Sequence, residues 1–162
     1  AVQLWKSLLD RPAYIDLDAL KNFIWSAPST DHHLDLASLN ALCLTQNYLR
    51  AGHSVILDKA FGHYPFVQPF LAEAAAQGVA AHYFKLTASL PVLVARNARR
   101  REYTADELLE NARWRRYCAP DENVERIYRF FEEHAHPQGV ELDTEQLAID
   151  EVVTLIREAV ER

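Results

Sequence analysis

Three aspartates stand directly behind apolar runs that have the composition of β-strands. Asp16 follows the run Ala-Tyr-Ile, Asp18 stands two residues later, and Asp58 follows the run Val-Ile-Leu. Ligands of open α/β sheets bind beyond the carboxyl ends of the strands, where such acids would gather. Carboxylate oxygens suit Mg²⁺, which proteins usually hold with one or two carboxylates together with substrate phosphates. The structural alternative is that Asp16 ends its strand and Asp18 caps the following helix.

A second group of residues that could do chemistry is basic. Arg96, Arg99 and Arg100 are spaced three and four residues apart, so they share one face of a helix. Guanidinium groups remain charged and bind phosphoryl oxygens in bidentate fashion. The alternative is a solvated basic helix whose arginines pair with acids such as Glu102 and Asp106. Carboxylates for a metal and arginines for phosphate in one domain indicate phosphoryl transfer.

Strand and helix patterns alternate along the chain, and the strands are too apolar to alternate between an inner and an outer face. Such strands are typical of a parallel sheet with helices on both faces, so the expected fold class is α/β. No repeat or linker divides the chain, which predicts a single domain over residues 1–162. Strands are expected at 13–16, 53–58, 79–87 and 139–142, and helices at 1–9, 19–25, 35–51, 65–77, 90–101, from 104, 124–134 and 147–160.

Composition excludes several classes of protein. The net charge of −6 argues against a nucleic-acid partner, since contact with phosphates needs a basic surface. No apolar run is long enough to cross a bilayer, so no membrane span is expected. The two cysteines, Cys43 and Cys118, have no CxxC spacing and predict a reduced, cytoplasmic protein. Cys43 lies in a helical pattern of leucines, which predicts a small core residue.

Four short motifs carry a resemblance to a known family. They are the segments 14–18 (Tyr-Ile-Asp-Leu-Asp), 54–58 (Ser-Val-Ile-Leu-Asp), 90–101 with its arginines, and 141–144 (Glu-Leu-Asp-Thr). In this order and spacing the chain resembles small-molecule kinases of the P-loop superfamily, near the chloramphenicol phosphotransferase, shikimate and gluconate kinase and zeta-toxin groups. The resemblance implies a three-layer fold with a five-stranded parallel sheet and a lid segment at about 97–120.

One departure from that family is large. Its members carry a glycine-rich loop, GxxxxGK[ST], whose backbone N–H groups and lysine hold the phosphates. The sequence has only 4 glycines and no such motif. The simplest expectation is that the first strand and this loop precede Ala1, which would leave the flanking strands unpaired on one side. The alternative is a degenerate member that has lost ATP binding.

The resemblance also implies roles for the acids and the arginines. Asp18 would bind the substrate hydroxyl and act as general base, and Asp16 would hold Mg²⁺ through water. Asp58 would assist the metal or the substrate. Arg96 and Arg100 would stabilise the transferring phosphoryl group.

The remaining implied site residues are less directly tied to the chemistry. Arg99 and Arg101 would help to bind the nucleotide, and Thr144 would border its adenine. Lys59 and His63 could line the acceptor pocket, although a surface loop is the favoured explanation for both. Trp25 could form an aromatic wall of the same pocket or belong to the core.

The sequence therefore predicts an ATP- and Mg²⁺-dependent transferase, a kinase that phosphorylates a hydroxyl group of a small molecule. A nucleotide-binding or toxin-type relative without catalysis is the main alternative. A metal phosphoesterase using Asp16, Asp18 and His32 is a third. Whether the protein is a monomer or a homodimer stays open.

Overall fold

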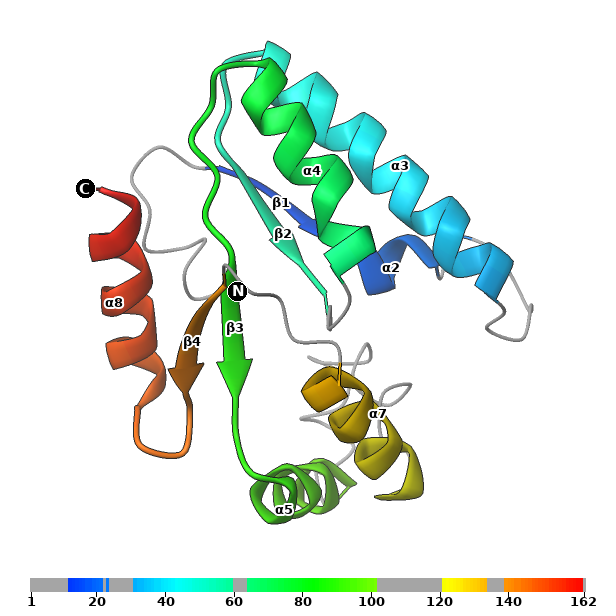
Figure 1. The fold of residues 1–162 in the computed structure, drawn as a ribbon, viewed down its shortest axis with the longest axis vertical. Helices are drawn as coiled ribbons and strands as arrows, with labels where there is room; N and C mark the ends of the chain where they lie inside the picture. Colours follow the sequence, from blue (N-terminus) through cyan, green and yellow to red (C-terminus); the bar gives the residue numbers. More distant parts are fainter. Residues whose placement is uncertain are drawn as a thin grey trace.

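Strands and helices alternate in the computed structural model, which describes residues 12–21, 23, 31–59, 64–101, 121–133 and 139–161 (Figure 1). This alternation confirms a mixed α/β fold. The elements are β1 (Ala13–Asp16), α2 (Leu17–Lys21), α3 (Asp31–Arg50), β2 (Val55–Asp58), α4 (Tyr64–Ala76), β3 (Phe84–Thr87), α5 (Leu90–Arg101), α7 (Asp121–Glu133), β4 (Val140–Asp143) and α8 (Ile149–Val160). The helices expected at 1–9 and from residue 104 lie outside the described residues.

The four strands form two separate parallel pairs. In one pair β1 lies beside β2, with Asp16 opposite Asp58; in the other β3 lies beside β4, with Thr87 opposite Asp143. The parallel orientation agrees with the sequence prediction. One continuous sheet does not form among the described residues, because β2 and β3 do not pair with each other.

Each pair has a backbone edge that no other described strand covers. In a parallel ladder alternate residues bond to one neighbouring strand, and the residues between them face the other side. The N–H of Ala13 donates to the carbonyl of Ser54 at 2.8 Å, so the groups of Val55 and Leu57 face away from β1. The same alternation turns the backbone of two β3 residues away from β4: Phe84 and Leu86. No hydrogen bond from another described residue reaches these two edges.

The larger hydrophobic core lies between the β1–β2 pair and the helices α3 and α4. Its buried members are Ile15, Leu17 and Ala41, and the last two have no exposed surface. Ile15 lies opposite Leu57 in the ladder and points to the same face as Leu57 and Val55, because residues two apart in a strand share a face. The partly buried residues that pack around this centre are Leu20, Leu44, Val55, Leu57 and Phe70.

Polar side chains also hold α3 to α4. The carboxylate of Glu73 accepts hydrogen bonds from the side-chain amides of Gln46 on α3, at 2.8 Å, and of Gln77, at 2.6 Å. The bonds from Gln77 and Gln46 hold the pKa of Glu73 below its usual value. Glu73 therefore stays ionised and links the ends of the two helices.

The smaller core lies between β4 and α8, where Leu142, Val152 and Ile156 are buried together. The opposite face of the β3–β4 pair is polar, since Lys85 and Glu141 form an ion pair there at 2.9 Å. The prediction that all strands are apolar on both faces is therefore wrong for this pair. Its strands alternate because the described helix α8 covers only one of their faces (Figure 1).

A glycine follows each of the helices α3 and α4. Gly52 and Gly78 have φ angles of 80° and 69°, in the left-handed region that glycine adopts without strain. Gly52 follows the end of α3, and its N–H donates to the carbonyl of Leu49 at 2.9 Å. Both turns return the chain toward the next strand.

Two further expectations fail at the surface of α3. Cys43 is exposed rather than part of the core, because it lies on the side of the helix that faces away from β1 and β2. The helix also begins at Asp31, four residues before the expected start at residue 35.

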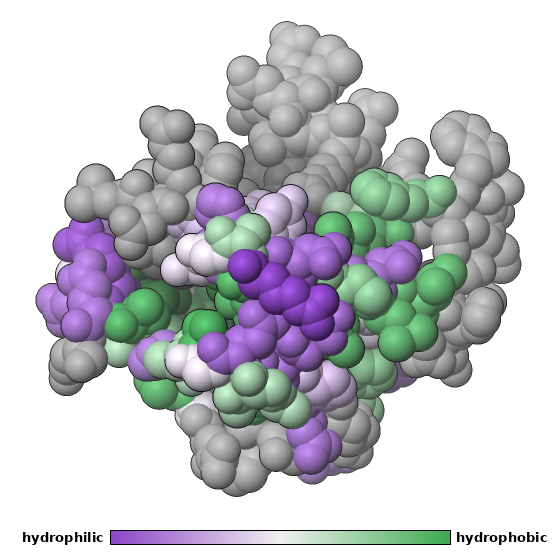
Figure 2. Space-filling model, turned by 90° about the horizontal axis from the view of Figure 1, so that it is seen from above, coloured by the Kyte–Doolittle hydropathy of each residue, from purple (hydrophilic) through white to green (hydrophobic). Residues whose placement is uncertain are grey.

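Hydrophobic and hydrophilic residues lie side by side on the face shown in Figure 2. Among the described helices, none has the length and apolarity required to cross a membrane.

Candidate active site at the strand ends

The parallel register of β1 and β2 brings two of the predicted acids to the same level. Asp16 and Asp58 are direct partners across the ladder, each at the last position of its strand. Tyr14 lies two residues before Asp16 and therefore on the same face of the pair. Its hydroxyl donates to Oδ2 of Asp58 at 2.7 Å, which fixes the orientation of that carboxylate.

Asp16 also has a structural role. Its Oδ1 accepts a hydrogen bond from the backbone N–H of Ala19 at 2.9 Å, so Asp16 caps the short helix α2. The structural alternative was that Asp16 ends its strand, and this is confirmed because β1 ends at Asp16. It also assigned the cap of the following helix to Asp18, which is wrong because Asp16 makes that cap. Asp18 lies in the first turn of α2, partly buried, and is not the residue that caps the helix.

The donor set at these strand ends fits Mg²⁺ only in combination with a substrate. One oxygen of each carboxylate already accepts a hydrogen bond, from Ala19 for Asp16 and from Tyr14 for Asp58. No cluster of three or more His, Cys, Asp or Glu side chains within the described residues could hold a metal ion by itself. Mg²⁺ is commonly held by two carboxylates plus phosphates and water, so the pair suits a metal that arrives with a nucleotide.

A second set of predicted residues meets at the carboxyl ends of β3 and β4. The guanidinium of Arg96, on α5, donates to the Thr144 hydroxyl at 2.7 Å and to its carbonyl at 2.6 Å. The Thr144 hydroxyl in turn donates to the carbonyl of Thr87 at 2.8 Å. The structure therefore joins Arg96 and Thr144, which the sequence assigned to different roles, in one contact.

The turn after β4 also holds the start of α5. A carboxylate oxygen of Glu145 accepts the backbone N–H of Ser89, whose carbonyl receives the first hydrogen bond of α5 from Leu93. The hydrogen bonds from Ser89 hold the pKa of Glu145 below its usual value, and the nearby Arg96 charge lowers it further. Glu145 thus acts on α5 as a capping acid supplied by another element.

This contact predicts a measurable pH dependence. Because the folded-state pKa of Glu145 lies below its ordinary value of 4.5, the stabilisation is complete above that value. It is lost as the pH falls through the lowered folded-state pKa. In an NMR titration, the Ser89 amide shift should change with a midpoint below 4.5, and Glu145→Gln should remove this titration. Glu141→Gln, on the exposed ion pair, is the matched control and should leave it intact. A midpoint at or above 4.5 would contradict the assignment.

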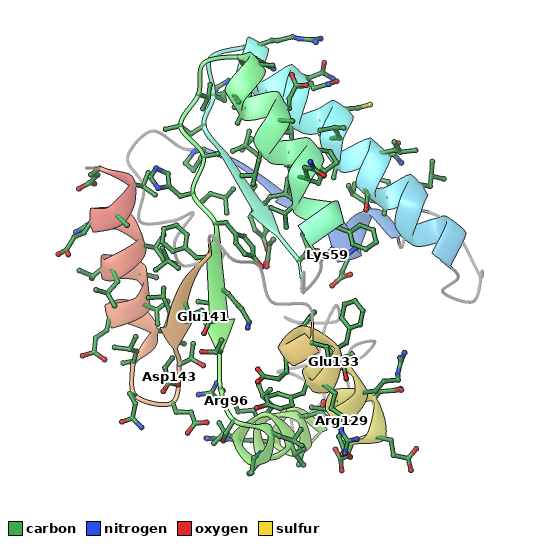
Figure 3. All side chains as sticks on the ribbon, viewed as in Figure 1. Lys59, Arg96, Arg129, Glu133, Glu141 and Asp143 are labelled. Carbon is green, nitrogen blue, oxygen red and sulfur yellow. The ribbon has the colours of Figure 1, made fainter. Side chains whose placement is uncertain are left out.

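The other predicted site residues do not take part in the Asp16–Asp58 pairing or the Arg96–Thr144 contact described above. Lys59 follows β2 directly, and its ammonium lies 5.2 Å from the ring centre of Phe66. Figure 3 shows Lys59 at the end of β2 and Arg96 beside the end of β4, so they belong to different strand pairs. Arg99 is exposed on α5. The backbone of α5 includes Arg100 and Arg101, whose side chains lie outside the described residues, as do His63 and Trp25 entirely.

No family model matches the chain, and no curated protein matches it. Among solved structures, the chain is similar to the tunicamycin resistance protein of Deinococcus radiodurans. The alignment has 13% sequence identity and a TM-score of 0.63, and it covers 99% of this chain and 88% of that one. At this identity the likeness shows the fold alone, which is the P-loop kinase-like fold of that protein.

Sequence reasoning missed three residues of these strand ends. Tyr14 could have been found, because its two-residue spacing from Asp16 places it on the same face as the acids. Thr87 and Glu145 carry no local signal, since their partners lie more than 50 residues away in the chain.

Proposed function

We propose that the protein is a phosphotransferase that uses ATP and Mg²⁺ to phosphorylate a hydroxyl group of a small molecule. The observation that carries this proposal is the pairing of Asp16 with Asp58 at the ends of adjacent parallel strands. Ligands bind at this edge in α/β sheets, and two carboxylates are a common protein contribution to a Mg²⁺–nucleotide site. The P-loop kinase-like fold of the structural neighbour supports the same class of reaction.

The acids have separate roles in this proposal. Asp18 accepts the proton of the acceptor hydroxyl as that oxygen attacks the terminal phosphoryl group, which is general base catalysis. Asp16 and Asp58, paired at the ends of β1 and β2, would hold Mg²⁺ together with phosphate oxygens of the nucleotide. The bound ion would neutralise the charge that develops on the phosphoryl oxygens. Lys59, His63 and Trp25 line the acceptor side.

The arginines of α5 act on the nucleotide side. Arg96 and Arg100 stabilise the transferring phosphoryl group, while Arg99 and Arg101 contact the nucleotide. A guanidinium has five N–H donors, and Arg96 uses two of them on Thr144, so donors remain for an anion. Thr144 borders the adenine. Of the expected lid at 97–120, residues 102–120 lie outside the described residues.

Two observations favour a second candidate, a nucleotide-binding or toxin-type relative without catalysis. The 162 residues contain no glycine-rich loop with a lysine, which kinases of this fold use to hold phosphates. In addition, Arg96 already makes two hydrogen bonds to Thr144. This candidate predicts nucleotide binding with no transfer to any acceptor.

An assay on the full-length protein separates these candidates. The protein is mixed with ATP, Mg²⁺ and a panel of sugar, nucleoside and ring alcohols, and ADP and phosphorylated product are measured. Acceptor-dependent ADP formation supports the phosphotransferase. ATP binding by calorimetry without product supports the second candidate. Absence of both binding and transfer would contradict the two together.

A further inference from the structure

The carboxylate of Asp58 is held by a side chain from the neighbouring strand. The hydroxyl of Tyr14 on β1 donates to Oδ2 of Asp58 at 2.7 Å, across 44 residues of chain. Within the described part of the chain, no other group donates a hydrogen bond to this carboxylate. A hydroxyl that donates to an ionised carboxylate makes a shorter and stronger bond than one between neutral groups. Asp58 therefore depends on Tyr14 for its orientation.

The strand register explains why Tyr14 reaches this carboxylate. Tyr14 is the direct partner of Ile56, and Asp58 follows Ile56 by two residues on the same face of the pair. Tyr14 is thus a diagonal neighbour of Asp58, and an aromatic side chain can span such a separation. Ile15 packs with α3 on the opposite face. The Tyr14–Asp58 contact therefore lies on the face of the pair that the larger core does not occupy.

Asp16, the partner of Asp58 in the ladder, is oriented by a different kind of group. The backbone N–H of Ala19 donates to its Oδ1 at 2.9 Å, so the main chain of α2 helps to fix this carboxylate. Asp58 relies instead on a side-chain hydroxyl. A single substitution can remove that hydroxyl while the aromatic ring and both strands stay the same.

We propose that Tyr14 is a positioning residue: it holds the Asp58 carboxylate in the orientation in which this acid contributes to binding Mg²⁺ with the nucleotide. Carboxylates that ligate metals are commonly oriented by hydrogen bonds from a residue behind them, and loss of that partner typically costs about 10–100-fold in metal affinity or activity. A carboxylate that is ordered before the ion arrives loses little conformational entropy on binding. The inference rests on the metal site of the proposed function, but it does not require transfer to an acceptor.

Tyr14→Phe removes the hydroxyl and keeps the ring. The affinity of the full-length protein for adenylyl imidodiphosphate, a non-hydrolysable ATP analogue, is measured by calorimetry with Mg²⁺ and with EDTA. The ratio of the two affinities is the metal-dependent gain. This gain should fall roughly tenfold or more in Tyr14→Phe, while the affinity in EDTA should not change. An unchanged gain in this variant overturns the inference.

Tyr128→Phe is the matched control. It also removes a tyrosine hydroxyl, but from α7, a helix that packs on α5 rather than on β1 and β2. The metal-dependent gain of this variant should equal that of the wild-type protein. An equal fall in Tyr128→Phe and Tyr14→Phe would show that the loss is not specific to the Asp58 contact, and would overturn the inference.

A double-mutant cycle separates positioning from a purely structural role. Asp58→Ala should lose most of the metal-dependent gain, and adding Tyr14→Phe to it should cost little more, because Tyr14 acts through Asp58. Additive losses would overturn the inference. Urea midpoints of all variants are measured as well, so that each titration is made where the variant is folded. A lower midpoint in Tyr14→Phe with an unchanged gain would make Tyr14 structural alone.

The outcomes also separate this inference from the proposed function. If Tyr14→Phe loses the gain but the wild-type protein phosphorylates no acceptor, the positioning role stands and the phosphotransferase function fails. If the wild-type protein phosphorylates an acceptor and Tyr14→Phe keeps the full gain, the function stands and the inference is wrong. A wild-type protein whose affinity for the analogue is the same with Mg²⁺ and with EDTA also overturns the inference.

Discussion

Asp18→Asn is expected to abolish phosphoryl transfer while leaving the affinity for ATP nearly unchanged. General base catalysis contributes roughly 10²–10⁴-fold to the rate, and asparagine cannot accept the proton. The fold should tolerate the change, because Asp16 rather than Asp18 caps α2. Initial rates at saturating ATP, together with calorimetric titration of ATP, measure the two quantities separately.

Asp150→Asn is the matched control for this variant. Asp150 also lies in the first turn of a helix, α8, which packs on the other strand pair, so the substitution removes the same charge away from Asp16, Asp18 and Asp58. It should leave both rate and affinity unchanged. Equal loss of rate and ATP affinity in Asp18→Asn would indicate a role in metal binding or folding instead, and an unchanged rate would remove Asp18 from the mechanism.

Local patterns were sufficient to predict the elements that carry the site. The apolar runs that end on Asp16 and Asp58 form parallel strands, and α5 has the predicted bounds Leu90–Arg101. These features depend on side-chain periodicity and strand composition, which the sequence displays directly. Gly52 and Gly78, after α3 and α4, carry the same kind of local signal, since a left-handed turn favours a residue without a Cβ.

Contacts between distant segments were not predictable in the same way. Arg96 reaches Thr144 across 48 residues of chain, and Tyr14 reaches Asp58 across 44. Residue types suggested that each could do chemistry, but no pattern within the chain encodes which partner it meets. The pairing of Arg96 with Thr144 changes the interpretation of both, because a phosphate would have to share Arg96 with the β4 turn.

The arrangement of the strands shows a second limit. The sequence predicted where the apolar strands lie in the chain. It did not predict which strand lies next to which, because the order of the strands is a property of the whole sheet. Val55 and Leu57 on β2 have no described partner beyond β1.

The exposed position of Cys43 shows a similar limit on a helix. A helical leucine pattern identifies the buried face, but a small residue at the margin of that face can lie on either side.

Leu17→Ala is expected to lower the free energy of unfolding by roughly 2–5 kcal/mol, the usual cost of truncating a buried leucine. Leu17 is 0% exposed and packs with Ile15 and Ala41, so the cavity would open in the centre of the larger core. Domains are commonly stable by only about 5–15 kcal/mol, so this loss is a large fraction of the total. Urea denaturation followed by circular dichroism measures it as a lower midpoint.

Leu39→Ala on α3 is the control, since that leucine is 60% exposed and its loss should shift the midpoint little. Equal shifts in the two variants would contradict the assignment of Leu17 to the core centre. The position of Leu17 also links stability to the proposed chemistry, because it lies between Asp16 and Asp18 in the chain. At temperatures where Leu17→Ala remains folded, a looser α2 should therefore lower the transfer rate through Asp18 more than it lowers ATP affinity.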